Sequence, residues 1–426
     1  MLEANLRGTA ITKMERLPLL VFNMCKDRFS VEEKPEQAQE SSGPSRRQQE
    51  KSSIRHRLRE LRQLYKSASD KEKPGLVALR EQLRKKLKLL SERERLRKKR
   101  IRRKKTLSKF YRDPFKFVGE VLSKPKSGKL VCTETEMNES IQKAHKDQLQ
   151  NTSLGEMPDI RPVPQPTVAF REGDITLGEV KNIIRKARAN SAPGPSGLTY
   201  KVYKHCPLLT ERLWKLLRVI WRKKEIPATW LIAEGCFVPK EENSCTLDQF
   251  REISLLSVEG KIFWSVIANR LSDFLENNSY IDTTVQKGGV KGFSGCLEHT
   301  SAMSMLIGEA KKFKTDLAVV WLDLQKAYPS IPHQLISTAL VHYHVPYPVI
   351  SMVEKHLGGM HMRFSSGSVT SKFHRLEKGI MAGCTISVTL FIAAMNVILE
   401  EAKRECKSPC SADNVHHPFV EHLWMI

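Results

Sequence analysis

The stretch AVVWLDLQKAYPSI, residues 318–331, places one acid, Asp323, directly after five apolar residues. Such a short apolar run predicts a fully buried β-strand. A carboxylate beside a buried strand is costly unless a cation or a metal ion compensates its charge, or unless it faces solvent at the strand end. The sequence therefore predicts a strand that ends at Asp323, and it leaves open whether this acid is a metal ligand or a solvent-facing cap of the following turn.

The segments on either side combine helices and strands without regular alternation, which indicates the α+β class. Thr176 and Glu179 have the spacing of a capping box, followed by an apolar stripe of Val180, Ile183, Ile184 and Ala187. The other predicted elements are helices over 208–221, 259–275 and 386–402, a helix beginning near Ser330, a strand at 235–240, and a hairpin around Ser365 to Ser368.

The first third of the chain is polar and basic. Residues 31–53 are nearly free of apolar residues, so we expect disorder over 1–53. Leucines at helical spacing then predict a helix, a turn and a second helix within 54–110, whose Leu stripe also permits coiled-coil self-association through residues 54–105. Residues 111–175, rich in Pro, Gly and Ser, indicate a linker.

Positive charge is concentrated in this region. The whole chain has 71 Lys and Arg against 47 Asp and Glu, a net charge of +24, and residues 51–105 alone hold 23 against 6. A solvated charged helix is one explanation; a nucleic-acid contact, doubling as a nuclear import signal, is the other. On charge alone, nucleic acid is the leading candidate partner and an anionic membrane surface is second. No apolar run is long enough to span a membrane, and we expect no membrane partner. Nine scattered cysteines indicate a reduced, intracellular protein of the nucleus or cytoplasm.

Six motifs between residues 175 and 406 resemble, in order, the reverse transcriptase of non-LTR (LINE-type) retrotransposons. They are APGPSGLTYKVYK (192–204), FVPKEENSCTLDQFREISLLSVEGKIF (237–263), ANRL (268–271), QKGGVKGFSGCLEHT (286–300), the D-x-x-x-A-Y of residues 323–328, and KGIMAGCTISVTLF (378–391). The resemblance implies a right-hand polymerase with fingers over 176–310, a partial palm over 311–405 and a tail over 406–426.

The resemblance also implies roles for six residues. Asp323 would be the catalytic ligand of Mg²⁺, a hard ion that prefers oxygen. Lys240 and Arg251 would contact the triphosphate of a dNTP, since Arg forms bidentate contacts and Lys a point charge. Tyr328 would pack under the sugar, and Gly379 and Gly383 would let backbone approach the template base pair. The implied partners are an RNA template and a DNA primer.

Some residues depart from the family pattern. Glu252, Ala382 and Val388 stand where Pro, Gln and Pro are common, and the paired aspartates and the thumb expected after residue 402 are missing from this sequence. We therefore expect a truncated polymerase that lacks metal-dependent activity, because two metal ions cannot be held well by one carboxylate. The alternatives are a non-catalytic RNA- or DNA-binding protein derived from a retroelement, and a decayed reading frame that folds poorly.

Overall fold

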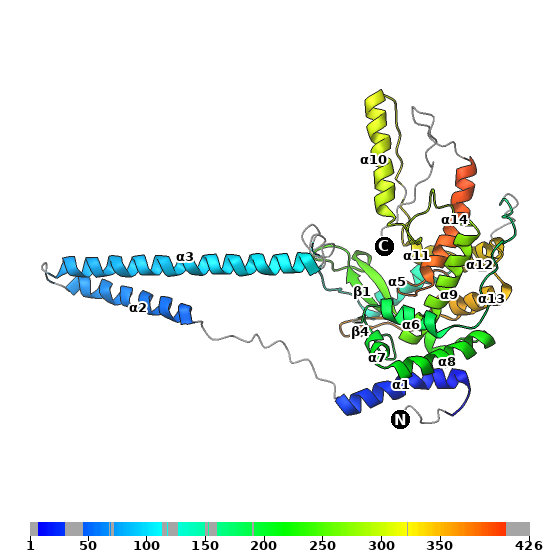
Figure 1. Cartoon of the computed structure of the whole chain (residues 1–426), viewed down its shortest axis with the longest axis horizontal. Helices are drawn as coiled ribbons and strands as arrows, with labels where there is room; N and C mark the ends of the chain where they lie inside the picture. The colour runs from blue at the N-terminus through cyan, green and yellow to red at the C-terminus, as the bar shows by residue number, and fades with distance from the viewer. Residues whose placement is uncertain are drawn as a thin grey trace. The chain divides into compact units, whose positions relative to one another are not determined.

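The structure, a computed structural model, describes residues 7–29, 46–67, 69, 72–112, 117, 127–149, 152, 160–189, 191–321 and 323–405. It divides into two compact units, one formed by residues 1–29 with 126–426 and one formed by residues 30–125. Figure 1 shows their helices and strands with the labels used below. The predicted tail over 406–426 lies outside the described residues.

The second unit contains two antiparallel helices, α2 (Arg46–Ser67) and α3 (Lys73–Arg112). Ile54 and Leu61 of α2 are buried against α3, and Lys51 forms an ion pair with Glu94 at 2.7 Å. The helix, turn and helix expected from the leucine spacing are therefore present. The apolar side chains of α2 pack on α3 of the same chain, so this packing says nothing about contacts between two chains. Self-association through these helices remains a prediction.

The first unit contains a small mixed sheet with strand order β2-β1-β3-β4, in which β5 also pairs with β3. Strand β1 (Ile232–Pro239) pairs antiparallel with β2 (Phe250–Leu255) and parallel with β3 (His361–Ser366). Strands β4 (Val369–Thr370) and β5 (His374–Arg375) are antiparallel to β3. The expected hairpin around Ser365 to Ser368 is the β3–β4 turn, in which Gly367 supplies a φ of +61°.

Helices cover this sheet and enclose the core. Helix α9 contributes many buried apolar side chains to this core, including Ile262, Phe263 and Trp264. The helices of this unit, with two short 3₁₀ turns, are α1 (Ala10–Phe29), α5 (Glu134–His145), α6 (Leu177–Lys186), α7 (Tyr200–His205), α8 (Pro207–Lys223), η1 (Ala228–Trp230), η2 (Leu247–Gln249), α9 (Val258–Asn277), α10 (Cys296–Phe313), α11 (Ala327–Ser330), α12 (His333–His342), α13 (Tyr347–Gly359) and α14 (Ser387–Glu405).

Two expectations about the N-terminal half need correction. Residues 10–29 and 46–53 are helical rather than disordered, because apolar side chains such as Met14 and Leu17 lie on one face of α1 and are buried in the first unit. The expected linker over 111–175 contains α5, which Thr133 and Glu136 cap and which buries Met137 and Ile141.

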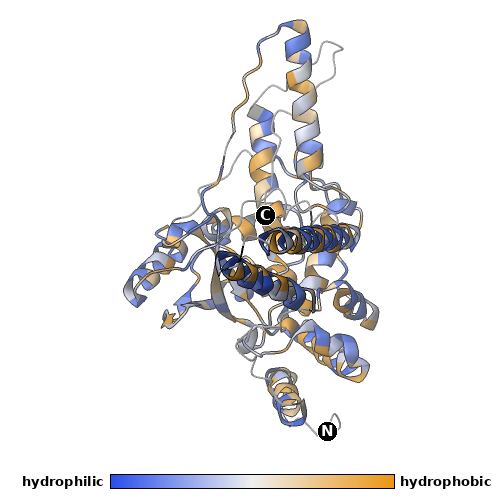
Figure 2. Ribbon diagram, turned by 90° about the vertical axis from the view of Figure 1, so that its left-hand side faces the viewer, coloured by the Kyte–Doolittle hydropathy of each residue, from blue (hydrophilic) through white to orange (hydrophobic). Residues whose placement is uncertain are grey.

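The buried strand expected before Asp323 is also absent from the described residues. Residues 315–321 are extended but lie outside the strands, and Val320 and Trp321 are 79% and 69% exposed. A strand can be buried only when its backbone N–H and C=O groups form hydrogen bonds with a neighbouring strand. No described strand pairs with residues 315–321. Helix α10 before it projects from the rest of the unit (Figure 1), and Figure 2 shows hydrophobic residues along this topmost helix.

Among the described residues, no helix has both the length and the apolar character that crossing a membrane requires.

Candidate functional site

The loop of residues 376–386 lies against the turn that carries Tyr328. The N–H of Gly379 donates to the carbonyl oxygen of Ile331 (2.8 Å), and the N–H of Ile380 donates to that of Tyr328 (2.9 Å). Gly379 has a φ of +88°, and a Cβ on it would lie 2.6 Å from the carbonyl oxygen of Pro329. Only glycine fits this position, because any side chain would clash with the backbone of α11.

The same loop also lies against β2. The N–H of Ser254 donates to the carbonyl oxygen of Ala382 at 2.8 Å. Gly383 has a φ of +122°, and a Cβ there would lie 2.2 Å from the carbonyl oxygen of Ser254. The two predicted glycines therefore contact the protein's own backbone, Gly379 near Tyr328 and Gly383 on the strand of Arg251. One loop thus contacts both parts of the candidate site.

Tyr328 is held by α14. Its ring lies 5.2 Å from the ring of Phe391, centroid to centroid, and the side chain is half-buried against the core. Burial raises the pKa of Tyr328 to about 12, because the phenolate would lose its hydration. The residue is thus a neutral, fixed ring at neutral pH, which suits either a packing role or a surface for a sugar.

Lys240 and Arg251 lie on the hairpin formed by β1 and β2. Arg251 pairs in register with Val238, and the N–H of Lys240 donates to the carbonyl oxygen of Gln249. This register places both cations on the same face as diagonal neighbours, because residues two apart on a strand share a face. Both are exposed, and Lys240 Nζ donates to the carbonyl oxygen of Asp248 at 2.6 Å.

Glu252, on the opposite face of β2, contacts a residue that the sequence patterns did not single out. Its Oε2 lies 3.5 Å from Nε2 of His145, the last residue of α5, which is only 2% exposed. Burial favours a higher pKa for Glu252, but His145 and the charges of Lys326 and Lys240 outweigh it, so the pKa lies below its usual value. The capping-box spacing of Thr133 and Glu136 was the signal that could have revealed α5 and this contact.

A hollow of about 610 Å³ lies beside this contact. It is bounded by α5, by residues 325–330 and by residue 378, and its charged lining consists of Lys143, Lys326, Lys378, Glu136, Glu139 and Asp248. Three lysines and three acids nearly balance, so the hollow has no strong preference for an anion.

Asp323 stands apart from this arrangement. It is exposed in the extended segment that precedes α11. Nowhere in the described part of the chain do three or more His, Cys, Asp or Glu side chains gather into a group that could hold a metal ion. The described residues therefore do not fit a two-metal site, which needs several carboxylates close together. The other five predicted residues lie on elements that the 376–386 loop connects.

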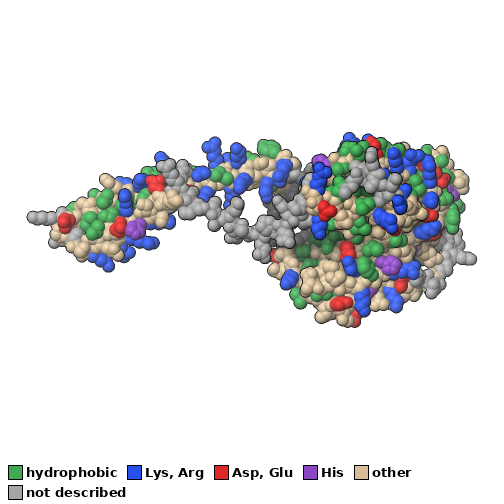
Figure 3. All heavy atoms as spheres, turned by 90° about the horizontal axis from the view of Figure 1, so that it is seen from below, with side chains coloured by type: hydrophobic (Ala, Val, Ile, Leu, Met, Phe, Trp, Pro, Cys, Tyr) green, Lys and Arg blue, Asp and Glu red, His purple; other side chains and the backbone are tan. Residues whose placement is uncertain are grey.

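The second unit supplies a separate charged surface. From Arg95 to Arg112, every residue of α3 is exposed, and 11 of these 18 residues are Lys or Arg while none is acidic. Figure 3 shows Lys and Arg side chains protruding along this unit. We call residues 95–112 the basic segment.

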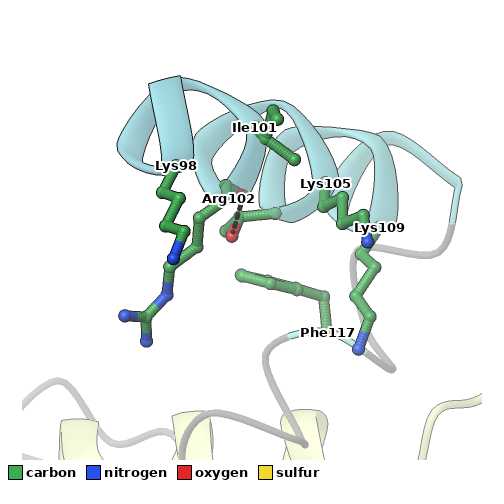
Figure 4. Close-up of a pocket in the computed structure, with 7 residues that line it drawn as sticks. Lys98, Ile101, Arg102, Lys105, Lys109 and Phe117 are labelled. Atoms are coloured by element: carbon green, nitrogen blue, oxygen red, sulfur yellow. Dashed lines mark hydrogen bonds between the residues drawn. The ribbon is translucent and has the colours of Figure 1, made fainter. Parts of the chain in front are cut away.

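One face of the basic segment borders a hollow of about 480 Å³. Phe117 lies under the helix in Figure 4, and the cations around it are Lys98, Arg102, Lys105 and Lys109. The ring of Phe117 also contacts that of Phe110 edge-on, at 5.7 Å between centroids. The face combines positive charge with an aromatic floor, a combination that nucleic-acid-binding surfaces use.

Comparison with known proteins identifies the domain that contains the loop and hairpin. Residues 238–419 match the family model of reverse transcriptase (RNA-dependent DNA polymerase). Relatives include the Retrovirus-related Pol polyprotein from type-1 retrotransposable element R2 of Nasonia vitripennis (25% identical, covering 52% of this chain and 22% of the relative) and that of type-2 element R2DM of Drosophila melanogaster (24%, covering 51% and 20%).

A third relative, the Transposon TX1 uncharacterized 149 kDa protein of Xenopus laevis, is 24% identical over 54% of this chain and 17% of its own length. The matches thus span about half of this chain but only about a fifth of each of these relatives. The resemblance found from the six motifs is confirmed: residues 238–419 match the reverse transcriptase family, and the chain is similar to proteins of the R2 and TX1 non-LTR retrotransposons, as a LINE-type reverse transcriptase would be.

Proposed function

We propose that residues 176–310 act as the fingers and residues 311–405 as part of the palm of a LINE-type reverse transcriptase, and that the chain binds an RNA template paired with a DNA primer. The observation that carries the proposal is the 376–386 loop, which contacts both the turn of Tyr328 and the strand of Arg251. A nucleotide site needs such convergence of a ring for the sugar and cations for the phosphates.

In this proposal Lys240 and Arg251 contact the triphosphate of a dNTP, Tyr328 packs under its sugar, and Gly379 and Gly383 hold the loop that supports the base pair. Asp323 is the one proposed ligand of Mg²⁺, which in this reaction class activates the primer hydroxyl and clamps the leaving group. Since the described residues bring no second carboxylate to Asp323, we propose that this chain binds template and primer in the nucleus or cytoplasm without extending the primer.

The first experiment measures binding of an annealed RNA template and DNA primer to the full chain, with and without the next complementary dNTP. We expect the dNTP to stabilise the complex, and the double substitution Lys240→Ala, Arg251→Ala to reduce this stabilisation at least about tenfold, because each charge-assisted contact contributes about 1.5–3 kcal/mol. Lys215→Ala removes an exposed lysine of α8 as a matched control.

The second experiment adds Mg²⁺ and all four dNTPs. We expect no primer extension above the level of Asp323→Ala. Extension that Asp323→Ala abolishes would contradict the proposed loss of activity, while failure to bind template and primer at all would contradict the proposal as a whole.

A non-catalytic nucleic-acid-binding protein is the second candidate. The exposure of Asp323, away from any described group of acids, favours it. It differs from the first proposal in having no nucleotide site. It predicts the same binding of nucleic acid, but neither the dNTP nor the substitution of Lys240 and Arg251 should change that binding.

A further inference from the structure

The basic segment is the part of the second unit where α3 leaves the contact with α2. Up to Glu94, residues of α3 that face α2 are partly buried, and the Lys51–Glu94 ion pair closes this contact. From Arg95 onward every described residue of α3 is exposed, although Ile101, Leu107 and Phe110 keep less than half of their surface accessible. Apart from the edge-on contact of Phe110 with Phe117, the segment therefore has few of the apolar contacts from which most helices in proteins obtain their stability.

The charges of the basic segment surround the helix axis. With 3.6 residues per turn, its 11 cations leave no gap wider than about 60° around the axis. Around the helix axis, Leu96 and Leu107 lie between Arg103 and Arg100, and Tyr111 lies between Arg100 and Lys104, so the segment has no wide uncharged face to rest on a protein surface. A helix that contacts phosphates on one side only would need cations on that side alone.

Such a segment is unfavourable as a helix when it is free. Like charges three and four residues apart repel, as in the pairs Arg95–Lys99 and Lys99–Arg103. The segment contains no acid to offset this repulsion, and Glu94, directly before it, forms an ion pair with Lys98. A polyanion that supplies negative charge on several sides removes this repulsion. The helix is then coupled to its ligand, because binding stabilises the conformation in which the cations are displayed.

We infer that the basic segment enters the major groove of duplex DNA, with phosphates of both groove walls around it. This inference goes beyond the proposed binding of an RNA template and a DNA primer, because it assigns a second nucleic-acid partner, duplex DNA, to a different part of the chain. A helix with its side chains is about 10–12 Å across, which matches the B-DNA major groove of about 12 Å. The major groove of an RNA duplex is deep and too narrow for this. The segment, about 27 Å long, spans roughly 16 DNA phosphates.

The test compares two four-charge variants of the full chain that lose charge on opposite sides of the helix. One replaces with Gln the cations on the Phe117 side, Lys98, Arg102, Lys105 and Lys109. The other replaces with Gln those on the opposite side, Lys99, Arg100, Arg103 and Lys104. A third variant replaces four exposed cations of the first unit, Lys181, Arg185, Lys186 and Arg188, as a control for net charge. Gln has nearly the helix propensity of Lys and Arg, and exposed positions tolerate it.

The measured quantity is the slope of log K against log salt for a DNA duplex of about 20 bp, since each phosphate contact contributes about 0.9 to that slope. We expect both segment variants to flatten the slope by a similar amount, up to about 3–4, and the control to leave it nearly unchanged. Hydrogen exchange of amides 95–112 should slow when DNA is added. An RNA duplex of the same sequence should compete at least about tenfold less well.

Four outcomes would overturn the inference. The salt slope could flatten for only one of the two segment variants, which would indicate one-sided contact, or the control variant could flatten it equally. Duplex or single-stranded RNA could compete as well as duplex DNA, or the chain could bind a nuclear import receptor without binding DNA. None of these readouts requires a dNTP or primer extension. Failure of the proposed polymerase site would therefore leave this result intact, and failure here would leave the polymerase site intact.

Discussion

Gly383 is the residue of the candidate site with the least room. Its φ of +122° and the position of the carbonyl oxygen of Ser254, 2.2 Å from a built Cβ, both oppose a side chain. We expect Gly383→Ala to lower the free energy of unfolding by about 1–3 kcal/mol and to weaken dNTP-dependent binding. Urea unfolding measures the first effect.

The matched control for this prediction is Gly367→Ala, at a turn with a φ of +61° and open space around the built Cβ. It carries the cost of a left-handed backbone without a clash, so it should destabilise less and leave dNTP-dependent binding unchanged. Equal effects of the two substitutions would show that the contact with Ser254 is unimportant.

Glu252 gives the site a dependence on pH. Its pKa in the folded chain lies below the usual 4.5, so the carboxylate adds stability above that pH and loses this contribution as the pH falls through the lowered value. We expect Glu252→Gln to cost about 1–3 kcal/mol at neutral pH, because His145 stays buried without its partner. The cost should shrink as the pH falls below the lowered pKa of Glu252.

A double-mutant cycle with His145→Ala checks that this effect runs through the contact between α5 and β2. Additive costs would mean that the two side chains stabilise the fold independently. In the sequence, Glu252 was only a departure from the family pattern, at a position where Pro is common. The structure gives it a partner, His145, from a helix that lies outside the six motifs.

Among the elements, α6 and α9 are joined by one buried arginine. Arg270, whose side chain is 1% exposed, donates to both carboxylate oxygens of Glu179 (2.8 and 3.0 Å) and to three backbone carbonyl oxygens, those of Arg171, Gly173 and Asp174. We expect Arg270→Lys to destabilise the chain by about 3–5 kcal/mol, because Lys cannot reproduce the planar set of donors and the acceptors remain buried.

Thermal unfolding of the variants measures this cost. Arg222→Lys, at an ion pair with Asp174 in which the Arg222 side chain is 59% exposed, is the control and should cost no more than about 1 kcal/mol. A small effect of Arg270→Lys would show that this network is not essential to the packing of α6 on α9.

The extended segment before α11 shows where sequence patterns stop being sufficient. Apolar content predicted a buried strand over 318–322, but burial of a strand depends on a partner elsewhere in the chain, which local residues do not encode. The elements that were predicted well carry their own signal: the capping box of Thr176 and Glu179, the apolar stripe of α9, and the β3–β4 turn at Gly367. At the site, the order of the motifs grouped the candidate residues. The 376–386 loop joins them through backbone hydrogen bonds, and apart from Gly379 and Gly383 no residue type in the sequence indicates these bonds.

This exposure leads to a test on the segment itself. Val320→Thr with Trp321→Gln should leave the free energy of unfolding within about 0.5 kcal/mol, because neither side chain is packed. The same substitutions should lower self-association measured by light scattering, since they remove exposed apolar surface. Tyr347→Gln, at a side chain of α13 that is 75% exposed, is the control. A loss of more than about 1 kcal/mol would instead indicate the buried strand that the sequence predicted.

On the scale of the whole molecule, folding and charge are divided between the two units. The core lies in the first unit, to which α1 and α5 contribute Met14, Leu17, Met137 and Ile141, while Ile54 and Leu61 are the buried apolar residues of the described part of the second. The basic segment needs exposure to meet a polyanion, and the reverse transcriptase domain needs a rigid core to hold its loop. Placing them in separate units satisfies both requirements.

Limited trypsin digestion tests this division and the alternative of a decayed frame that folds poorly. We expect early cleavage in the basic segment, whose Lys and Arg side chains are exposed, and a resistant fragment that begins near residue 127 and ends near residue 405.

The α1 peptide should remain bound to this fragment in size-exclusion chromatography, because Met14 and Leu17 are buried and Glu15 accepts from the N–H of Ala228 at 3.0 Å. Met14→Asp should release it. Cleavage throughout residues 127–405 would favour the decayed frame, since a poorly packed chain opens everywhere.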